Sequence, residues 1–415
     1  MKVLEQVKEL YNSLTKTEKD LFSLPEVGFK ESQTTAYLKS FLKAENIPIV
    51  DDYGINGFKA SIGSGKPHIG LISELDALYV PGHFQQGPNG EAHACGHHMQ
   101  STIMLHVMKI LNERSFHGTV SLFAIAAEEY IDMDFRRSLQ KKGVIALLSG
   151  KQNLLLKDAF NDVDVVVSVH TMGETSNASM EVNATLSGFI YKTIRFEGQG
   201  AHAAVAPSEG VNALNALALT QNAIAFLRET FREEERVRIH MITTNGGQSV
   251  NSVPEEAVLE GYIRAADPNV LHQVSQKVSN AAIHSAAALG AHASILDEMG
   301  YAPLIQCRPL SDIFVPYIKE VVPVVVDNQL SFAAGDIGDV GLFIPTIQLG
   351  YSGCVGRVHG NDFRMQDATE ALVNPTYVVS AGVIDLLEHP EKVKAITSSF
   401  NPSITIQEYR NLHGQ

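Results

Sequence analysis

The sequence predicts an α/β fold in which a larger domain, built on a mostly parallel sheet covered by helices, is interrupted by an inserted α+β domain. The chain has 415 residues, whereas single hydrophobic cores stop growing at about 250–300 residues, so two domains are expected. The first part of the chain alternates helical patterns with short apolar runs. From about Asn183 the pattern changes to half-exposed strands and long helices, and after about Tyr301 the first pattern returns.

Continuous apolar runs identify the strands of the larger domain. The runs His68–Leu75, Thr119–Ala126 and Val163–Val169 are short and almost wholly apolar, and a helical stretch that begins at Ser101 separates the first two. Such runs are typical of parallel strands buried on both faces of a sheet. Because ligands bind beyond the carboxyl ends of parallel strands, polar residues at these ends are expected to converge on one crevice. These residues are Glu74, Asp76, Glu128, Glu129 and His170.

The inserted domain is predicted over residues 183–300, so that residues 1–182 and 301–415 form the larger domain. Two helices against a few half-exposed strands describe a small α+β unit. The expected strands are Ile190–Glu197, Arg238–Thr243 and Val258–Arg264, and the expected helices are Val211–Arg232 and Asn269–Leu289. Beyond this domain, the apolar runs Val321–Val326 and Phe343–Leu349 continue the larger domain.

Composition and charge favour a small-molecule partner. The net charge of −14 and the pI near 5.6 disfavour a nucleic-acid partner, which needs a basic face. Three cysteines, distant from one another and odd in number, predict free thiols in a reducing compartment. The N-terminus lacks the apolar core of a signal peptide, and no run approaches the roughly 20 apolar residues of a membrane span. We therefore expect a soluble, cytoplasmic protein with no membrane partner.

The segment His93-Ala94-Cys95-Gly96-His97-His98 is the strongest local sign of chemistry. A thiolate and an imidazole two residues apart can reach one metal ion from a tight turn, and Gly96 permits the backbone that such a turn requires. An isolated pair of this kind is more often a buried cysteine beside surface histidines. Three histidines within six residues of a chain with few cysteines bring the two interpretations to even weight.

Other candidate ligands follow buried strands elsewhere in the chain. Glu128 and Glu129 end an apolar strand, and neighbours on an extended chain point to opposite sides, so one carboxylate could bind metal while the other acts as general base. A lone Glu-Glu pair is more often a solvated loop, and a lone histidine such as His170 or His359 is more often structural. Together, Cys95, His97, Glu129, His170 and His359 suffice for two metal ions with a shared ligand. No G-x-S-x-G elbow, G-x-G-x-x-G fingerprint or P-loop occurs.

The order of several motifs along residues 1 to about 390 resembles the M20 metallopeptidase family. The likeness is greatest to its amidohydrolase branch, which includes aminoacylases, hippurate hydrolases, auxin-conjugate hydrolases and aminobenzoyl-glutamate hydrolases. The motifs are S-E-L-D-A-L, H-A-C-G-H-H, A-A-E-E, V-H, G-x-G-A-H-A-A-x-A-P, G-G-Q-S-V-N-S-V-P, G-Y-I-R and G-D-I-G-D-V.

The resemblance implies a role for each matching residue. Cys95 would bridge two metals, His97 and His170 would complete one site, and Glu129 and His359 the other. Glu128 would be the general base, and Asp76 would orient the metal shell from behind. In the inserted lid or dimerisation domain, the residues that match substrate-contacting positions are His202, Asn251 and Arg264, with His202 reaching the site of a partner subunit in a homodimer.

Three positions depart from the family pattern. His98 stands where the family has an aspartate, Glu74 replaces the first aspartate of D-M-D-A, and Ala126 replaces the proline of P-A-E-E. The first change removes a carboxylate behind the metals and makes an extra imidazole available, which affects the expected metal preference. No direct ligand and no base is lost.

We therefore expect a metal-dependent amidohydrolase that uses two divalent ions per chain, zinc or manganese first and nickel or cobalt as alternatives. A hydroxide held by the two metals would attack the amide of an N-acyl amino acid or a dipeptide-like substrate, with Glu128 as general base and His202 stabilising the oxyanion. Arg264 would hold the substrate carboxylate. Two alternatives stay open: an amidase with Cys95 as nucleophile, and a non-catalytic homologue that binds a small ligand or scaffolds a partner.

Overall fold

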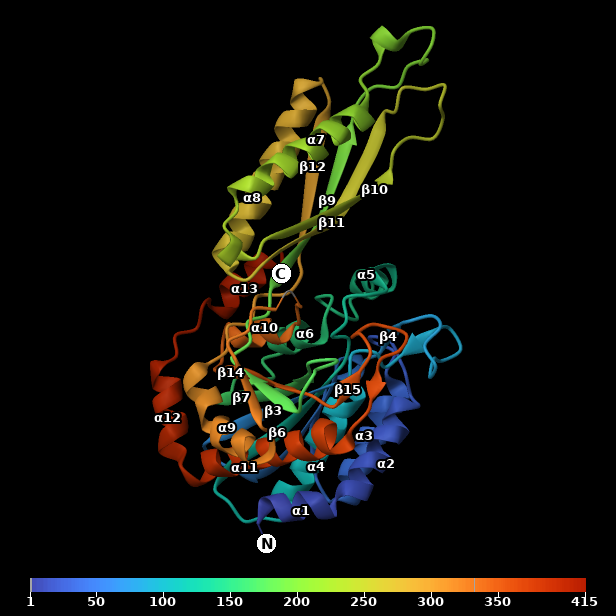
Figure 1. Ribbon diagram of the computed structural model, residues 1–415. Helices are drawn as coiled ribbons and strands as arrows, with labels where there is room; N and C mark the ends of the chain where they lie inside the picture. Colours follow the sequence, from blue (N-terminus) through green and yellow to red (C-terminus); the bar gives the residue numbers. More distant parts are fainter. Residues whose placement is uncertain (1, 332) are drawn as a thin grey trace. The chain divides into compact units, whose positions relative to one another are not determined.

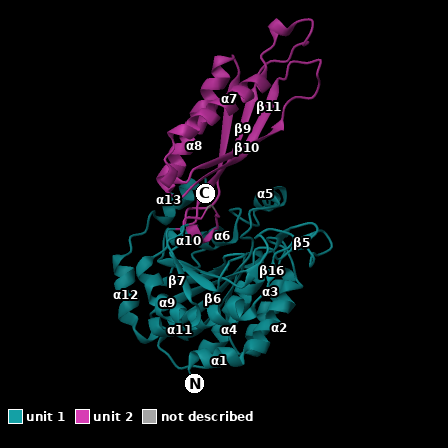
Figure 2. Cartoon of the chain, in the orientation of Figure 1, with its two compact units in different colours: residues 1–185, 305–329, 339–415 teal, residues 186–304, 330–338 magenta. Residues whose placement is uncertain are grey.

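The computed structural model describes residues 2–331 and 333–415 and divides them into two compact units (Figure 2). The first unit comprises residues 1–185, 305–329 and 339–415, and the second comprises residues 186–304 and 330–338. A mainly parallel sheet with helices in one unit and an α+β arrangement in the other confirm the predicted fold class. Among the described residues, none of the helices combines the length and the apolar character needed to cross a bilayer.

The first unit is built on an eight-stranded sheet whose four central strands, β6, β3, β7 and β14, run parallel (Figure 1). Antiparallel pairings of β2 with β6 and of β8 with β14 extend the sheet on its two sides. In order across the sheet, the strands are β1 (Ile49–Asp52), β2 (Gly57–Ser64), β6 (Gly118–Ile125), β3 (His68–Glu74), β7 (Val165–Thr171), β14 (Thr346–Tyr351), β8 (Ser179–Val182) and β13 (Val324–Asp327). Two short ribbons pair β4 (Leu78–Tyr79) with β5 (Glu91–Ala92) and β15 (Cys354–Val355) with β16 (Arg364–Met365).

Apolar side chains on both faces of the central strands explain why this sheet is covered by helices. Leu71 and Leu122 belong to a core cluster that includes most of α4, whereas Phe123, the next residue along β6, stacks on Phe160 with ring centroids 4.4 Å apart. Successive residues of a strand point to opposite faces, so both faces are buried. The helices of this unit are α1 (Val3–Glu9), α2 (Tyr11–Phe22), α3 (Ser32–Ala44), α4 (His97–Asn112), α5 (Met133–Lys141), α6 (Gly150–Leu156), α9 (Arg308–Val321), α11 (Asn374–Glu388), α12 (Pro390–Ser399) and α13 (Ile406–Leu412). The short α10 (Ile337–Gly341) spans the chain position where one unit passes into the other.

The second unit is a four-stranded antiparallel sheet with two long helices packed on one face (Figure 1). Its core joins Ile194 and Leu259 of the sheet to Leu217 and Val278 of the helices. In order across the sheet, the strands are β10 (Arg238–Asn245), β11 (Glu256–Ala265), β9 (Gly188–Glu197) and β12 (His292–Met299), and the helices are α7 (Ala213–Leu227) and α8 (Pro268–Ala288).

The segment 330–338 lies in the second unit, whereas the sequence boundaries assign it to the larger domain. Backbone bonding accounts for this placement. The backbone N–H of Ser187 donates to the carbonyl of Ala333 at 2.8 Å, and the Ser187 hydroxyl donates to the carbonyl of Ser331 at 3.1 Å. The segment is thereby tied to the start of the second unit, although it follows β13 of the first unit in the chain.

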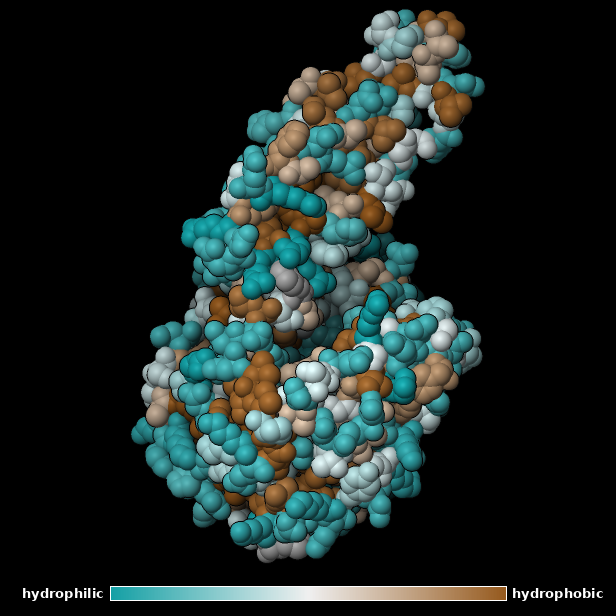
Figure 3. Space-filling model, in the orientation of Figure 1, coloured by the Kyte–Doolittle hydropathy of each residue, from teal (hydrophilic) through white to brown (hydrophobic). Residues whose placement is uncertain are grey.

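Hydrophilic residues cover most of the face of each unit that Figure 3 shows, and apolar residues appear there as small patches. In the second unit, the exposed apolar side chains include Ile242 on β10 and Leu296 on β12, at 55% and 58% exposure. Their strand neighbours Met241 and Ile295 pack against the core under the helices. Ile242 and Leu296 therefore lie on the face of the sheet that α7 and α8 do not cover.

Candidate metal centre

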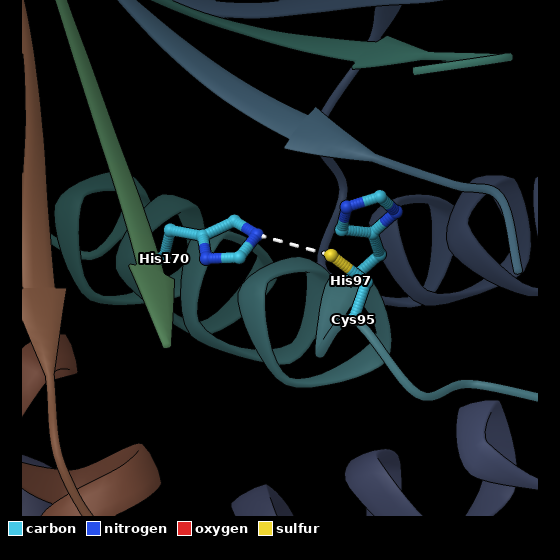
Figure 4. Close-up of side chains that lie close together, drawn as sticks. All are labelled: Cys95, His97 and His170. Carbon is cyan, nitrogen blue, oxygen red and sulfur yellow. Dashed lines mark hydrogen bonds between the residues drawn. The ribbon is translucent and has the colours of Figure 1, made fainter. Parts of the chain in front are cut away.

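Cys95, His97 and His170 form a first group of side chains suited to bind one metal ion. One donor atom of each lies within 4.8 Å of the donor atoms of the other two. The Sγ of Cys95 is 3.4 Å from Nε2 of His170, and the three side chains converge from the turn before α4, the start of α4 and the end of β7 (Figure 4). Ligands held at about 2.0–2.3 Å from one ion lie roughly 3–4.6 Å apart, so the spacing of Cys95 and His170 fits a shared ion.

A second group shares Cys95 with the first and adds Glu129 and His359. The Nε2 of His359 is 3.1 Å from Oε1 of Glu129. Glu129 follows β6, and His359 lies in the loop between β15 and β16, where its N–H donates to the carbonyl of Ala94 at 2.7 Å. The structure thus brings the five expected ligands together as two groups with a common thiol, which is the arrangement that a pair of bridged metal ions requires.

The turn at Gly96 allows Cys95 and His97 to face the same point. Gly96 precedes α4 with φ of +91°, in the left-handed region that favours glycine. A Cβ at this position would lie 2.8 Å from Cγ2 of Thr171. Any other residue would therefore both strain the backbone and collide with β7, which carries His170.

Hydrogen bonds behind the two groups fix which nitrogen each imidazole presents. Nδ1 of His97 donates to the Asp76 carbonyl at 2.9 Å and to Oδ1 of Asp76 at 3.1 Å, and Nδ1 of His170 donates to the carbonyl of Thr171 at 2.8 Å. A carbonyl only accepts, so each Nδ1 carries a proton and each Nε2 is the nitrogen that faces the cluster. Oδ2 of Asp76 accepts the N–H of Glu129 at 2.9 Å, so one carboxylate braces a residue of each group.

Glu128 lies beside the two groups. Its Oε2 is 3.9 Å from Nε2 of His97, its side chain is 11% exposed, and it forms a third group with His97 and Glu129. The neighbouring carboxylates of Glu128 and Glu129 therefore face the same region, contrary to the opposite directions expected of an extended chain. The pair lies outside β6, which ends at Ile125, and Ala127 has left the strand conformation with φ of +58°, so the alternation of an extended strand does not apply to it.

The electrostatics of the cluster favour a bound cation. Burial raises the pKa of the Cys95 thiol well above its ordinary value, and the nearby Glu129 carboxylate raises it further. Burial would also raise the pKa of the Glu129 carboxyl, but the hydrogen bond and charge of His359 and the charge of His97 lower it to about 2. A divalent ion supplies the positive charge that turns such a thiol into a thiolate ligand. Sulfur, imidazole and carboxylate donors together suit zinc and related ions.

The glutamate that departs from the family pattern, Glu74, makes an ion pair that the sequence did not reveal. Its Oε1 accepts from Nζ of Lys151 at 2.7 Å, and its Oε2 lies 3.3 Å from Nε2 of His97. Both side chains of the Glu74–Lys151 pair are buried, and Gln100 donates a further bond to Oε2 at 3.0 Å. Lys151 is the second residue of α6, 77 residues further along the chain, so no local pattern connects it with Glu74.

His98 does not offer the extra metal-facing imidazole that its sequence position suggests. Its Nε2 lies 3.3 Å from Oε1 of Glu18 on α2, and its ring packs on Phe22 with centroids 4.8 Å apart. Among the described residues, His98 belongs to none of the metal-ligand groups. One helical position separates it by about 100° from His97, so α4 directs the two imidazoles to different sides.

The expected substrate-contacting residues lie in the second unit, at two different places. His202 and Asn251 are exposed and belong to adjacent loops, where the N–H of Ala203 donates to the carbonyl of Asn251 at 2.9 Å. Arg264 lies near the end of β11, with its guanidinium 4.7 Å from the ring centroid of Tyr262. Because a strand rises about 3.3 Å per residue, the length of β11 places about 26 Å between these two positions.

Comparisons with known proteins found similar hydrolases and peptidases. Residues 185–288 match the model of a peptidase dimerisation domain of the M20 family. The chain is 31% identical over 273 residues to one subunit of the p-aminobenzoyl-glutamate hydrolase from Escherichia coli, an alignment that covers 62% of this chain and about half, 52%, of that relative. It is 26% identical to an IAA-amino acid hydrolase from Arabidopsis thaliana, over 92% of this chain and 85% of the relative.

A solved structure shares the fold. The crystal structure of a dinuclear metal-binding peptidase of the M20 family from Bacillus subtilis superposes with a TM-score of 0.73 at 20% identity, covering 92% of this chain and 99% of that one. The predicted family resemblance is thereby confirmed. The chain carries a peptidase dimerisation domain of the M20 type and is similar to hydrolases and metal-binding peptidases of that family.

Proposed function

We propose that this protein hydrolyses the amide bond of an N-acyl or N-aminoacyl amino acid with the help of two divalent metal ions. The observation that carries this proposal is the pair of ligand groups that share the Cys95 thiol. We assign the first unit as the catalytic domain and the second as the lid and dimerisation domain. The three cysteines are free thiols in the structure, which supports our placement of the protein in the cytoplasm.

The donor atoms favour zinc or manganese, with nickel and cobalt also compatible. Cys95, His97 and His170 would hold one ion, and Cys95, Glu129 and His359 the other. When bound, two such ions activate water and polarise the carbonyl under attack. Asp76 serves both sites, because it fixes the imidazole of His97 and the backbone of Glu129.

Glu128 is the general base of the proposed reaction. Its carboxylate is near the cluster and largely shielded from solvent. The group that contains Cys95 and His359 takes its carboxylate from Glu129, which leaves Glu128 for the role of base. Glu128 takes a proton from the attacking water and returns it to the amine that leaves when the amide bond breaks. A group in this role contributes about 10²–10⁴-fold to the rate.

A carboxylate on the leaving amino acid is supported by Arg264 and by the relatives. The guanidinium of Arg264 is stacked between Tyr262 and Phe189, at 4.7 and 5.7 Å from their ring centroids, which holds its planar fork in one orientation. Such a fork binds a carboxylate through two charge-assisted hydrogen bonds. The names of the relatives, p-aminobenzoyl-glutamate hydrolase and IAA-amino acid hydrolase, describe substrates in which an acyl group is joined to an amino acid.

The spacing within the second unit supports a role for His202 in a partner's site. About 26 Å of β11 separate the loop of His202 and Asn251 from Arg264, which exceeds the length of an N-acyl amino acid. One lid therefore cannot present both ends to one substrate. In a homodimer, the lid of one subunit can supply Arg264 to its own site and His202 to the other, where the imidazole stabilises the oxyanion.

Two substitutions of neighbouring residues test the proposal. Glu128→Gln should lower kcat by about 10²–10⁴-fold and leave about two metal equivalents bound, because the base is not a ligand. Glu129→Gln should instead weaken binding of one of the two equivalents. Metal analysis after reconstitution and turnover of N-acyl amino acids measure both effects. Wild-type protein that never binds more than one equivalent, or a Glu128→Gln variant with more than about a tenth of wild-type kcat, contradicts the mechanism.

The contact between Cys95 and His170 supports a second candidate, a thiol hydrolase in which His170 activates Cys95 as nucleophile. Their 3.4 Å separation is within reach of a Cys-His pair. This candidate predicts activity that survives removal of metal by a chelator and is lost on thiol alkylation. Loss of activity with the chelator, and recovery when metal is restored, excludes it.

A further inference from the structure

The turn that presents Glu128 and Glu129 has a backbone conformation that its own sequence does not favour. Strand β6 ends at Ile125, and Ala127 adopts φ of +58°, in the left-handed region. A residue with a Cβ is strained in this region. Contacts from outside the turn must therefore hold it in this shape.

A fully buried arginine supplies the donors for this turn. Arg136 on α5 has 0% exposure. Its Nη1 donates to the carbonyls of Leu148, at 2.6 Å, and Ala127, at 3.4 Å, and its Nη2 donates to the carbonyl of Glu129. One rigid guanidinium thus holds the carbonyl groups on both sides of Glu128.

A buried glutamate holds the other backbone group of Ala127. Glu31, 4% exposed, accepts the N–H of Ala127 at 2.8 Å through Oε1. The N–H and carbonyl of Ala127 are therefore held by side chains from two other segments of the chain. Gly28 permits this close packing, because a Cβ there would collide with Ala127 and Arg136.

On the basis of the proposed function, we propose that Arg136, together with Glu31, is a positioning residue that sets the carboxylates of Glu128 and Glu129 for catalysis and metal binding. Arg136 donates to the backbone carbonyls of Ala127 and Glu129, and so acts on the two carboxylates through the backbone of the turn. Its loss should loosen the group that contains Glu129 and His359. The group of Cys95, His97 and His170 comes from other segments and should keep its affinity.

Arg136→Lys is the sharpest substitution, because it keeps the positive charge but not the planar fork that spans several carbonyls. The matched control is Arg410→Lys, since Arg410 also donates to a backbone carbonyl, that of Leu156 at 2.9 Å. Calorimetric titration of the metal-free proteins with zinc measures the two binding steps separately. Steady-state kinetics of the reconstituted proteins separate kcat from KM, and thermal unfolding reports stability.

For Arg136→Lys, we expect one zinc-binding step to weaken by about 10–100-fold while the other changes by less than about threefold. We expect kcat to fall by a similar factor of about 10–100 with KM nearly constant, and the control to match wild type in both assays. A purely structural role would lower the unfolding temperature and weaken both steps together, or neither. Either pattern, or an unchanged kcat, overturns the proposal.

Glu31→Leu provides the test if Arg136→Lys does not fold. Leu cannot accept the Ala127 N–H, so the same selective weakening should appear. Equal affinities for both steps in Glu31→Leu and wild type would overturn the proposal. If wild-type protein binds only one zinc equivalent, the two-metal function itself is refuted. If wild-type protein and the variants all bind two equivalents with equal affinity, only the role of Arg136 is refuted.

Discussion

The protein should lose stability in mild acid through His106, a buried residue of the helix that begins with His97. Nδ1 of His106 donates to the carbonyl of Thr102 at 2.9 Å, and the hydroxyl of Ser13 lies 2.9 Å from Nε2. The ring has 0% exposure and packs on Phe41. Burial lowers the pKa of His106 to about 4, and the charge of Lys109 adds to this, against the opposing effects of the Thr102 hydrogen bond and Glu45.

The size of the effect follows from the two pKa values. An unfolded histidine has a pKa of about 6.5, so between about pH 6.5 and 4 the unfolded chain binds more protons at this position than the folded one. Stability contributed by neutral His106 is therefore complete above about pH 6.5 and is lost as the pH falls. Between about pH 8 and 5 the loss is about 2 kcal/mol.

Urea unfolding of wild type and His106→Gln, followed by far-ultraviolet circular dichroism, measures this loss. Other titrating groups cancel when the difference in unfolding free energy between the two proteins is compared at the two pH values. We expect this difference to shift by about 2 kcal/mol in favour of the variant at the lower pH. A shift below about 0.5 kcal/mol would show that His106 is protonated in the folded protein, and would refute the reasoning.

Two further predictions concern the dimer and the ion pair beside His97. A mixture of the inactive variants His202→Ala and Glu128→Gln should recover up to about a quarter of the wild-type rate. If His202 acts across the interface, half of the dimers are mixed and each mixed dimer has one intact site. No recovery despite demonstrated subunit exchange would show that His202 does not act in the partner's site. Lys151→Met should destabilise the protein by about 3–5 kcal/mol, because it leaves the Glu74 carboxylate buried without the ammonium group. The double variant with Glu74→Gln should recover much of this loss. Urea unfolding of the single and double variants measures both effects, and a cost below about 1 kcal/mol would show that the pair is solvated.

The central strands could be predicted from the sequence because their burial on both faces leaves an unbroken apolar run. The expected run at His68–Leu75 and the observed β3, His68–Glu74, differ by one residue. Strand β12, His292–Met299, was not predicted, because it is an edge strand in which exposed polar residues interrupt the apolar pattern. The expected helix at Ser101 begins four residues earlier, at His97, because the left-handed Gly96 ends the preceding turn.

The candidate ligands were recognised from the segment His93–His98 and from polar residues that follow apolar runs, but the residues that support them were not. Arg136 and Lys151 are charged residues in polar stretches, which ordinarily describe solvated helix faces. Both are fully buried. Lys151 pairs with Glu74, 77 residues away in the chain, and Arg136 donates to backbone carbonyls such as that of Leu148. Sequence spacing carries no information on a charge that is satisfied by long-range contacts, so only the folded backbone reveals these residues.

The second unit gives a physical reason why the proposed reaction needs two copies of the chain. Arg264 lies near one end of β11, and the loop of His202 and Asn251 lies beyond the other end, about 26 Å away. In the proposed reaction, both Arg264 and His202 contact one N-acyl amino acid, which is shorter than this distance. One second unit cannot supply both contacts to one substrate, so a second copy of the chain must supply one of them. We therefore expect a variant that loses dimerisation to lose catalysis as well.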